Sequence, residues 1–348
     1  MGCARKIATT VGIAFNLKRP SDDDAYEEYD EIETIEALQK ELEQYGCRVE
    51  LFEQDNAFLE RISSVKVDFV VNIAEGRGTS RGRESQVPCI LESCGIPYSG
   101  SDPVALGITL DKYLTGTILR SAGIRVPDQW LISTITDVKA LGRLLKTEKR
   151  FIVKPRWEGS SKGIFSNSIV STPEELAARV QTILRRYRQP ALVESFVPGD
   201  EITAGVCGNR HPRLLGMMRI RPRITTASPF IYSIEQKHAW ETQILYEPPQ
   251  VLPQRIRERV AQCALRTFAA LELRDIARID FRLCEDGIPA VIDVNPLPGL
   301  SPRYSDLPML CRLNGISYRR LVRMFLTAAL RRYSLRLPVP TGTKGLMR

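Results

Sequence analysis

The spacing of apolar residues in the first third of the chain alternates between that of strands and that of helices. Short apolar runs predict strands at residues 7–15, 48–52 and 69–73. Apolar residues three or four positions apart predict a helix over 31–45, and a shorter helix follows over 86–94. A glycine directly after each helix is a usual C-terminal signal. Because strands that alternate with helices form parallel sheets, this region is predicted to be an α/β unit on a parallel sheet.

The rest of the chain mixes helices and strands without such regular alternation. Helices are predicted at residues 111–122, 172–187, 253–271 and 318–333. Strands are predicted at residues 130–132, 150–153, 191–196, 201–206 and 213–220. Residues 221–240 are polar, contain proline and have no period, and loops of that length are usually functional or disordered. The pattern therefore predicts an α/β chain in which a parallel-sheet unit precedes further mixed lobes.

A predicted β-hairpin near the C-terminus brings acidic side chains together. Arg278 and Asp280 alternate with apolar residues, and Asp-Gly at 286–287 is a strong signal for a two-residue turn. With this turn, Asp280 pairs with Asp293 and Arg278 pairs with Asn295. Paired carboxylates lie about 5 Å apart and repel each other unless a positive charge lies between them. The hairpin therefore predicts a site for Mg²⁺, which prefers oxygen ligands and leaves room for phosphate; a surface hairpin with solvated acids is the alternative.

Composition excludes several classes of protein. The chain has 348 residues, 43% of them hydrophobic, which is enough for two or three domains with substantial cores. Its net charge of +8 favours an anionic ligand such as a nucleotide, or simply solubility, and is too evenly spread to predict nucleic-acid binding. Eight cysteines without a Cys-x-x-Cys pair, and only two histidines, argue against a standard zinc site and a disulfide framework. We expect a reduced, cytoplasmic setting and no membrane span.

Three other segments carry groups that suit nucleotide chemistry. Lys154 ends a predicted strand and begins the loop 154–163, which offers successive backbone N–H groups, hydroxyl groups and glycines. Such loops bind phosphate; the spacing is not that of a Walker A motif, and an ordinary Gly/Ser-rich turn is the alternative. In residues 194–201, a free strand edge can bind adenine and a carboxylate can bind ribose. Gly299 lets a ligand approach the backbone closely and has an N–H group suited to an oxyanion.

Taken together, these segments resemble the ATP-grasp superfamily and, within it, the D-alanine–D-alanine ligase family. The resemblance extends from about Val70 to the end of the terminal helix. The matching phrases are Gly-Ile-Pro-Tyr-Ser-Gly-Ser at 95–101, Leu-Asp-Lys at 110–112, Val-Lys-Pro at 153–155, Glu-Gly-Ser-Ser at 158–161, Ala-Arg-Ile-Asp-Phe at 277–281, and Asp-Val-Asn-Pro at 293–296 with Pro-Gly at 298–299. Each phrase is modest alone, but their order and spacing are specific.

The resemblance implies an ATP-grasp fold with three domains and a tail. Residues 1–110 would form an N-terminal Rossmann-like domain with a parallel sheet, and residues 111–196 a small central lid domain. Residues 197–335 would form a C-terminal antiparallel-sheet domain with the metal site, and residues 336–348 the tail. The implied ligands are ATP, two Mg²⁺ ions (with Mn²⁺ as an alternative) and amino-acid substrates. No nucleic-acid or membrane partner is expected, and a homodimer is left open.

The resemblance also implies a mechanism with an acyl-phosphate intermediate. One substrate carboxylate attacks the γ-phosphate of ATP, and the amine of a second amino acid then displaces phosphate. The implied ATP site consists of Lys112, Lys154, Glu158, Ser160, Ser161, Gly163, Glu194, Ser195, Phe196, Val197, Glu201 and Lys237. The implied catalytic residues are Arg278, Gly299, Lys237 and Ser160, and the implied metal ligands are Asp280, Asp293 and Asn295. Ser305 would bind the carboxylate of the second substrate.

Three departures from the family pattern concern the substrate rather than ATP. Residues 15–20 replace the usual glycines, and one of the acids in 22–33 would anchor the first amino group. Glu75 stands where the family has His, and His238 stands where peptide-forming members often have Tyr. A His at or near that place occurs in relatives that make D-alanyl-D-lactate. Three products therefore stay open, namely D-alanyl-D-alanine, a dipeptide of other amino acids, and a depsipeptide; an inactive nucleotide-binding module is the non-enzyme alternative.

Overall fold

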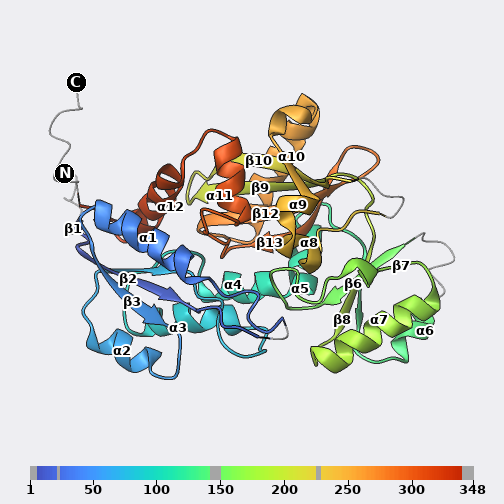
Figure 1. Ribbon diagram of the computed structural model, residues 1–348, viewed down its shortest axis with the longest axis horizontal. Coiled ribbons are helices and arrows are strands. Elements are labelled where there is room, and N and C mark those ends of the chain that lie inside the picture. Colours follow the sequence, from blue (N-terminus) through green and yellow to red (C-terminus); the bar gives the residue numbers. More distant parts are fainter. Residues whose placement is uncertain (1–5, 22–23, 142–149, 225–228, 339–348) are drawn as a thin grey trace.

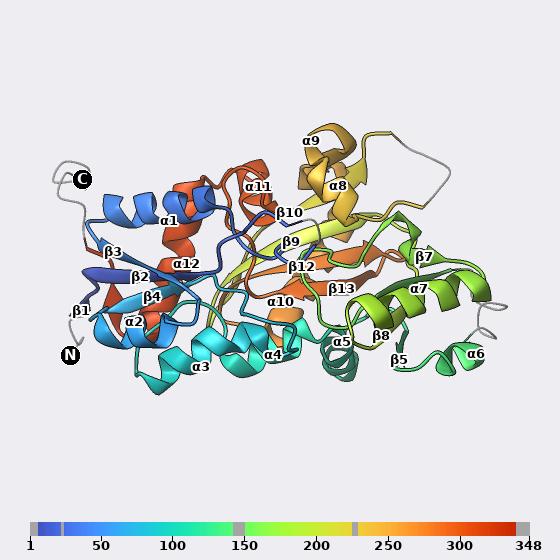
Figure 2. The same cartoon turned by 60° about the horizontal axis from the view of Figure 1, so that its bottom comes forward.

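The computed structural model describes residues 6–21, 24–141, 150–224 and 229–338. Parts of the acid-rich run and of the 221–240 loop, and most of the expected tail, lie outside these ranges. Within them the strands form three main sheets, which we call the N-terminal, central and C-terminal sheets, and one two-stranded pair. The C-terminal sheet lies between the other two (Figures 1 and 2). No helix in the described ranges is long and apolar enough to cross a membrane.

The N-terminal sheet is parallel, with the strand order β3-β2-β4, as the alternating pattern predicts. Its strands are β2 (Thr10–Phe15), β3 (Arg48–Glu53) and β4 (Phe69–Asn72), and its helices are α1 (Ile32–Gln44), α2 (Phe58–Ser64) and α3 (Gln86–Ser93). The strand predicted over 7–15 is confirmed over 10–15 as β2, but its start is separated as β1 (Lys6–Ile7). β1 leaves the sheet and pairs in parallel with β14 (Leu335–Arg336) near the C-terminus.

Two consecutive helices connect this unit to the central lobe. The second, α5 (Lys112–Ser121), is the helix predicted over 111–122, and the side chain of Asp111 accepts a hydrogen bond from its first turn. The first, α4 (Pro103–Leu110), is missing from the sequence interpretation although Asp102 caps it and proline occupies its first position. α4 is almost entirely apolar, so its sequence has no amphipathic period that would reveal a helix.

The central sheet is antiparallel, with the order β5-β8-β6-β7. Its strands are β5 (Gln129–Ile132), β6 (Phe151–Pro155), β7 (Ile169–Val170) and β8 (Ala191–Ser195), and the helical segments around it are α6 (Asp137–Leu141), η3 (Ser166–Ser168) and α7 (Pro173–Arg186). Figure 2 shows α7 in front of β8. Thr172 and Glu175 form a capping box that fixes the start of α7. The apolar side of α7 packs on the sheet and closes a separate small core.

The C-terminal sheet is antiparallel, with the order β11-β10-β9-β12-β13. Its strands are β9 (Glu201–Gly208), β10 (Arg213–Pro222), β11 (Ile244–Glu247), β12 (Asp275–Leu283) and β13 (Pro289–Asn295), and its helical segments are α8 (Ile234–His238), α9 (Trp240–Gln243), η4 (Pro249–Val251), α10 (Gln254–Ala270), α11 (Asp306–Leu313) and α12 (Tyr318–Arg332). Met217 packs in the core under α10, whereas Met218 packs with α11 and α12. Neighbouring strand residues face opposite sides, so helices cover both faces of this sheet.

The register predicted for the hairpin β12–β13 is confirmed around Asp280 and is wrong near the turn. Asp280 pairs with Asp293 and Arg278 with Asn295, as predicted. Closer to the turn each pair is displaced by one residue, so that Phe281 faces Val291. Ile292 is the extra residue of a β-bulge that restores the predicted pairing. The loop is therefore longer than the two-residue turn, and the bulge compensates for it.

One buried carboxylate joins the N-terminal unit to the C-terminal sheet and the terminal helix. Asp275 begins β12 with a φ of 66° and is fully buried. Its carboxylate accepts hydrogen bonds from the Gly100 N–H at 2.8 Å, from Asn209 Nδ2 at 2.8 Å, and from Arg332 Nη2 at 2.6 Å. Gly100 belongs to the N-terminal unit, Asn209 to the turn after β9, and Arg332 to α12. The N-terminal unit and the C-terminal sheet therefore share a hydrophobic cluster and an ion pair.

Candidate active site

Two adjoining cavities lie where the lobes meet. The larger has a volume of about 490 Å³ and the smaller of about 100 Å³. The residues that line both are Lys112, Ser160, Tyr232, Lys237, Arg278, Asp293 and Asp306. These residues come from α5, from the loop after β6, from the segment that contains α8, and from the hairpin and α11. Concave sites between lobes are usual places for small ligands.

The smaller cavity contains the residues that the resemblance assigns to ATP, and all of them except Gly163 line it. Lys154 projects from β6 and is only 4% exposed. Its ammonium lies 2.8 Å from the Glu194 carboxylate and donates to the carbonyl oxygen of Ile292 at 3.2 Å. Because Ile292 is the bulged residue, the bulge both sets the register of the acids and presents a carbonyl group to this lysine.

The glycine- and serine-rich loop holds strained backbone at the junction of the cavities. Ser160 and Ser161 have φ angles of 47° and 60°, a region that costs a residue with a side chain about 1–2 kcal/mol. The Ser161 hydroxyl donates to the carbonyl oxygen of Tyr232 at 3.2 Å. Gly163 has a φ of 72°, and a Cβ there would lie 2.4 Å from Pro155 Cγ. Gly163 therefore shapes the loop from behind and does not line the cavity.

The predicted metal ligands share one face of the hairpin. The Asp280 carboxylate accepts from Arg278 Nη2 at 2.9 Å and from the Asn295 amide at 3.2 Å, and Asp293 lies 3.0 Å from the Lys112 ammonium. Burial opposes ionisation of Asp293, but Lys112 and other cations outweigh it and lower the pKa of this carboxyl group. The described residues hold no cluster of three or more His, Cys, Asp or Glu side chains around one point. Two carboxylates and an amide oxygen next to the buried lysines of the smaller cavity nevertheless fit Mg²⁺, which takes few protein ligands and keeps room for phosphate.

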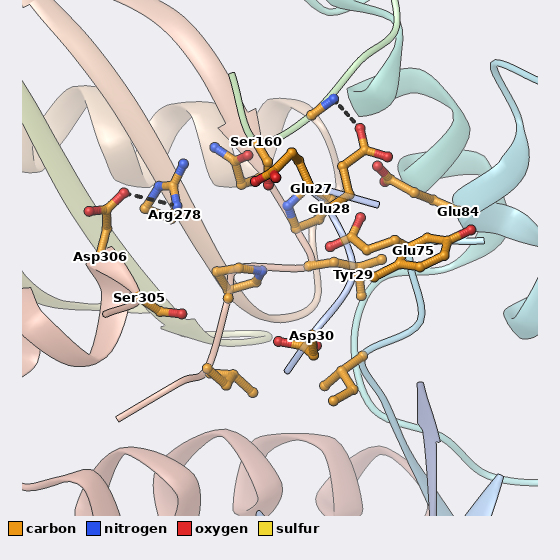
Figure 3. Close-up of a pocket in the computed structure, with 18 of the residues that line it drawn as sticks. Glu27, Glu28, Tyr29, Asp30, Glu75, Glu84, Ser160, Arg278, Ser305 and Asp306 are labelled. Atoms are coloured by element: carbon orange, nitrogen blue, oxygen red, sulfur yellow. Dashed lines mark hydrogen bonds and ion pairs between the residues drawn. The ribbon is translucent and has the colours of Figure 1, made fainter. Parts of the chain in front are cut away.

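Arg278 occupies the centre of the site, between the two cavities. Its guanidinium bonds Asp280 and lies 3.4 Å from the Asp306 carboxylate. Burial disfavours its charge, but Asp280 and Asp306 outweigh burial and raise the pKa of Arg278 above its ordinary value. Figure 3 shows Arg278 and Asp306 joined on one side of the pocket. Asp306 escaped the sequence interpretation although it directly follows Ser305, because its contacts are made only in the fold.

Lys237 and His238 end the short helix α8 above the site. Lys237 lines both cavities, and its ammonium lies 5.3 Å from the centre of the Tyr232 ring. Burial, and then the charge of Arg278, lower the pKa of Lys237. His238 is more exposed, and its Nε2 lies 2.9 Å from the Glu27 carboxylate. The predicted lid residues therefore face the site, Lys237 inward and His238 at the rim.

Gly299 and Ser305 lie together on the wall of the larger cavity. The Ser305 hydroxyl accepts a hydrogen bond from the Ser301 N–H at 3.0 Å. A Cβ on Gly299 would lie 2.7 Å from the Ser305 oxygen, so only glycine fits without a shift of this serine. The structure thus places the implied oxyanion donor next to the implied carboxylate-binding residue.

The opposite wall of the larger cavity carries four carboxyl groups, which we call the acid wall: Glu28, Asp30, Glu75 and Glu84. Arg83 binds Glu28 with two short hydrogen bonds of 2.6 and 2.8 Å. Burial raises the pKa of Asp30 to about 7 and that of Glu84 to about 8, and it raises the pKa of Glu75 well above its ordinary value. Only Glu75 was singled out from the sequence. Glu84 and Arg83 lie in a polar segment, and no periodicity there indicated burial.

Comparisons with known proteins give a consistent result. The family model described as D-ala D-ala ligase C-terminus matches residues 118–327. The D-alanine–D-alanine ligase A of Bacillus cereus is 32% identical over 277 residues, which cover 79% of this chain and 85% of the relative. A putative D-alanine–D-lactate ligase of Streptomyces coelicolor is 32% identical over 269 residues, 77% of this chain and 73% of the relative. The crystal structure of the Bacillus anthracis D-alanine–D-alanine ligase complexed with ATP superposes with a TM-score of 0.71 at 26% identity, covering 93% of this chain and 98% of that chain.

Proposed function

Because the chain belongs to the D-alanine–D-alanine ligase family and is an ATP-dependent ligase with the ATP-grasp fold, we propose that it joins the carboxyl group of one amino acid to the amine of another. The observation that supports this most is that the two cavities adjoin and share lining residues. The smaller cavity holds buried lysines suited to phosphates, and the larger one has room for substrates. Lys237 and Arg278 stand at their junction, where a γ-phosphate and a carboxylate would meet.

In the first step, a carboxylate oxygen of the first amino acid attacks the γ-phosphorus of ATP. The bond from this phosphorus to the bridging oxygen breaks, and ADP leaves an acyl phosphate behind. Lys112, Lys154 and Lys237 would bind the phosphate oxygens, since all three line the smaller cavity. Phosphoryl transfer depends mainly on positioning and charge neutralisation, and buried ammonium groups supply both.

The hairpin would complete the phosphate site. Asp280, Asp293 and Asn295 would hold Mg²⁺, which neutralises phosphate charge when bound. The Ser160–Ser161 backbone would close over the phosphates, and its contact with Tyr232 joins this loop to the segment that carries Lys237. Closure would exclude water, which would otherwise hydrolyse the acyl phosphate.

In the second step, the amine nitrogen of the second amino acid attacks the acyl carbon. Phosphate leaves, the nitrogen loses a proton, and an amide bond forms. Arg278 and the Gly299 N–H would stabilise the tetrahedral oxyanion, a contribution that is typically worth about 10²–10³ in rate per donor. Ser305 would bind the carboxylate of the second substrate, since it lines the larger cavity beside Gly299.

Phosphate release from ATP tests this function directly. The protein with ATP and Mg²⁺ is incubated with D- and L-amino acids, singly and in pairs, and product masses are recorded. We expect release that depends on amino acid, a product lighter by one water than its two substrates, and loss of both in Lys154→Met. Glu60→Gln, on the exposed side of α2, is the matched control and should retain activity. Absence of amino-acid-dependent release across the whole panel would reject the proposal.

A depsipeptide ligase is the second candidate, because His238 lies at the cavity rim with the Glu27 carboxylate 2.9 Å away. This contact holds the imidazole at the rim, where it would face the second substrate, such as a hydroxy acid. The comparison is D-lactate against D-alanine as acceptor, from pH 6 to 9, in the wild type and in His238→Tyr. An ester product that disappears in the variant supports this candidate; amide as the sole product at every pH rejects it.

A further inference from the structure

The acid wall is assembled from separate parts of the first lobe. Asp30 precedes α1, Glu75 follows β4, and Glu84 lies in the short helix η1 (Arg83–Ser85). Figure 3 shows Glu75 and Glu84 with Glu28 on the side of the pocket opposite Arg278 and Asp306. The wall therefore faces the groups that would carry out the reaction, across the space that the first substrate would occupy.

Most carboxylates around this cavity have a cationic or hydrogen-bonding partner. Glu28 binds Arg83 and the Gly159 N–H. Lys162 lies 2.7 Å from Glu158, and Lys112 lies 3.0 Å from Asp293. Glu27 is likewise held by Lys18 and His238. Lys112, Lys162 and Arg83 are thus already paired with other carboxylates, whereas Lys237 lies over the Tyr232 ring.

Glu75 and Glu84 have no such partner in the described part of the chain; Glu31 has none there either, but its side chain is exposed. Among the residues that the structure describes, no group donates a hydrogen bond to either carboxyl group, and neither forms an ion pair within 4.0 Å. Glu84 is nevertheless only 7% exposed, and it lines the larger cavity together with Glu75. A buried carboxyl group without a partner is costly, because it loses hydration and gains no hydrogen bond.

The cost of burying the Glu75 and Glu84 carboxyl groups in ionised form raises their pKa. Burial and then the neighbouring carboxylates Glu84, Glu28 and Asp30 raise the pKa of Glu75. For Glu84, burial is again the largest cause, and it outweighs the charges of Arg83 and Lys112. A cationic amine between the carboxyl groups of Glu75 and Glu84 would offset their repulsion. It would also donate the hydrogen bonds that they lack. The wall is therefore complementary to a positive ligand group.

The α-amine of an amino acid does not account for this pair. The family resemblance assigns that amine to an acid in residues 22–33, and Glu27, Glu28, Asp30 and Glu31 from this range line the same cavity. Glu75 and Glu84 come from other elements and remain available. A methyl side chain such as that of alanine would leave both without a partner.

We infer that the first substrate is an amino acid with a second amine on its side chain, and that Glu75 and Glu84 bind this amine. This inference rests on the proposed ligase function and specifies its substrate class. The side-chain amine donates to both carboxylates, while the α-carboxylate points toward Arg278 and the γ-phosphate. Glu75 and Glu84 are then residues that determine specificity, and the reaction itself is unchanged.

Matched pairs of amino acids that differ in charge but little in size provide the test. Phosphate release is measured with ornithine against norleucine and with diaminobutyrate against norvaline, as D and L forms, with alanine as reference. We expect kcat/KM for the diamino acid to exceed that for its neutral counterpart about tenfold or more, the effect of one charge-assisted hydrogen bond. Glu75→Gln and Glu84→Gln should each reduce this ratio toward one, while Glu60→Gln should leave it unchanged.

Binding is measured separately from turnover, by the thermal shift that ornithine and norleucine produce in the wild type and both variants. A larger shift with ornithine that is lost in the variants supports the inference. If neutral amino acids turn over as well as diamino acids and stabilise the protein equally, the inference is overturned while the ligase function stands. If no amino acid stimulates phosphate release, the ligase function fails, and an equal thermal shift for both ligands then overturns the inference as well.

Discussion

Replacing Asp275 with alanine is predicted to destabilise the whole molecule, because this carboxylate joins three segments. The substitution removes the acceptor for Gly100, Asn209 and Arg332, and it leaves the Arg332 guanidinium without its anion. Removal of one partner of a buried ion pair typically costs about 3–5 kcal/mol. Arg332 keeps hydrogen bonds to the carbonyl oxygens of Tyr98 and Gly100, so the lower half of this range is expected.

The expected change in melting temperature follows from the size of the chain. An entropy of unfolding of about 2.1 cal/mol/K per residue gives about 0.7 kcal/mol/K for the whole chain. A loss of about 3–4 kcal/mol then lowers the melting temperature by about 4–6 °C. Thermal unfolding monitored by circular dichroism measures this shift. Asp275→Asn should lose less, because asparagine keeps one acceptor oxygen and tolerates the left-handed backbone.

Glu272→Ala is a control that separates the loss of the ion pair from the strain of placing alanine in left-handed backbone. Glu272 has a φ of 51° and an exposed side chain, so alanine there meets similar backbone strain but breaks no buried contact. We expect its melting temperature to stay within about 1 °C of the wild type. If Asp275→Ala unfolds at the same temperature as Glu272→Ala, the buried ion pair does not join the lobes, and the reasoning is refuted.

Three further predictions concern the site. Lys154→Met should weaken ATP binding at least tenfold in calorimetry, and it should also lower thermal stability, because Glu194 loses its partner at 2.8 Å. Gly299→Ala should reduce product formation about 10–100-fold with little change in stability. Its Cβ would lie 2.7 Å from the Ser305 oxygen, so this hydroxyl would have to move. An unchanged rate would contradict the prediction. Burial raises the pKa of Glu84 to about 8 in the folded protein, so the folded state binds this proton more tightly than the unfolded state. The free energy of unfolding should therefore fall as the pH rises toward 8, and Glu84→Gln should make this fall smaller; parallel urea-unfolding profiles for the two proteins would show that Glu84 does not titrate in this way.

The sequence predicted the residues that line the smaller cavity better than those of the acid wall in the larger one. Lys154, the loop after it and the hairpin acids each follow a strand or a turn signal within a few residues, so local patterns locate them. The ATP-grasp fold and the ligase class are confirmed by the comparisons. The individual roles of these residues stay predictions that the variants above test.

The substrate half depends on contacts between distant segments. Glu84 meets Glu75 and Glu28 only because η1 folds back beside the end of β4, and nothing in the local sequence encodes that approach. Asp306 likewise reaches Arg278 through the packing of α11 on the sheet. The hairpin is a smaller example of a feature that local sequence does not reveal. Its register at Asp280 depends on a bulge that no turn rule indicates.

By itself, the sequence determined most of the strands, the longer amphipathic helices and the parallel first sheet, because periodicity and turn residues act over short distances. Only the tertiary structure decided that β1 leaves its sheet to join β14, that Asp275 joins the N-terminal unit to the C-terminal sheet, and that Glu75 and Glu84 lack partners among the described residues. These features depend on which charges are buried next to one another, and burial is a property of the assembled lobes.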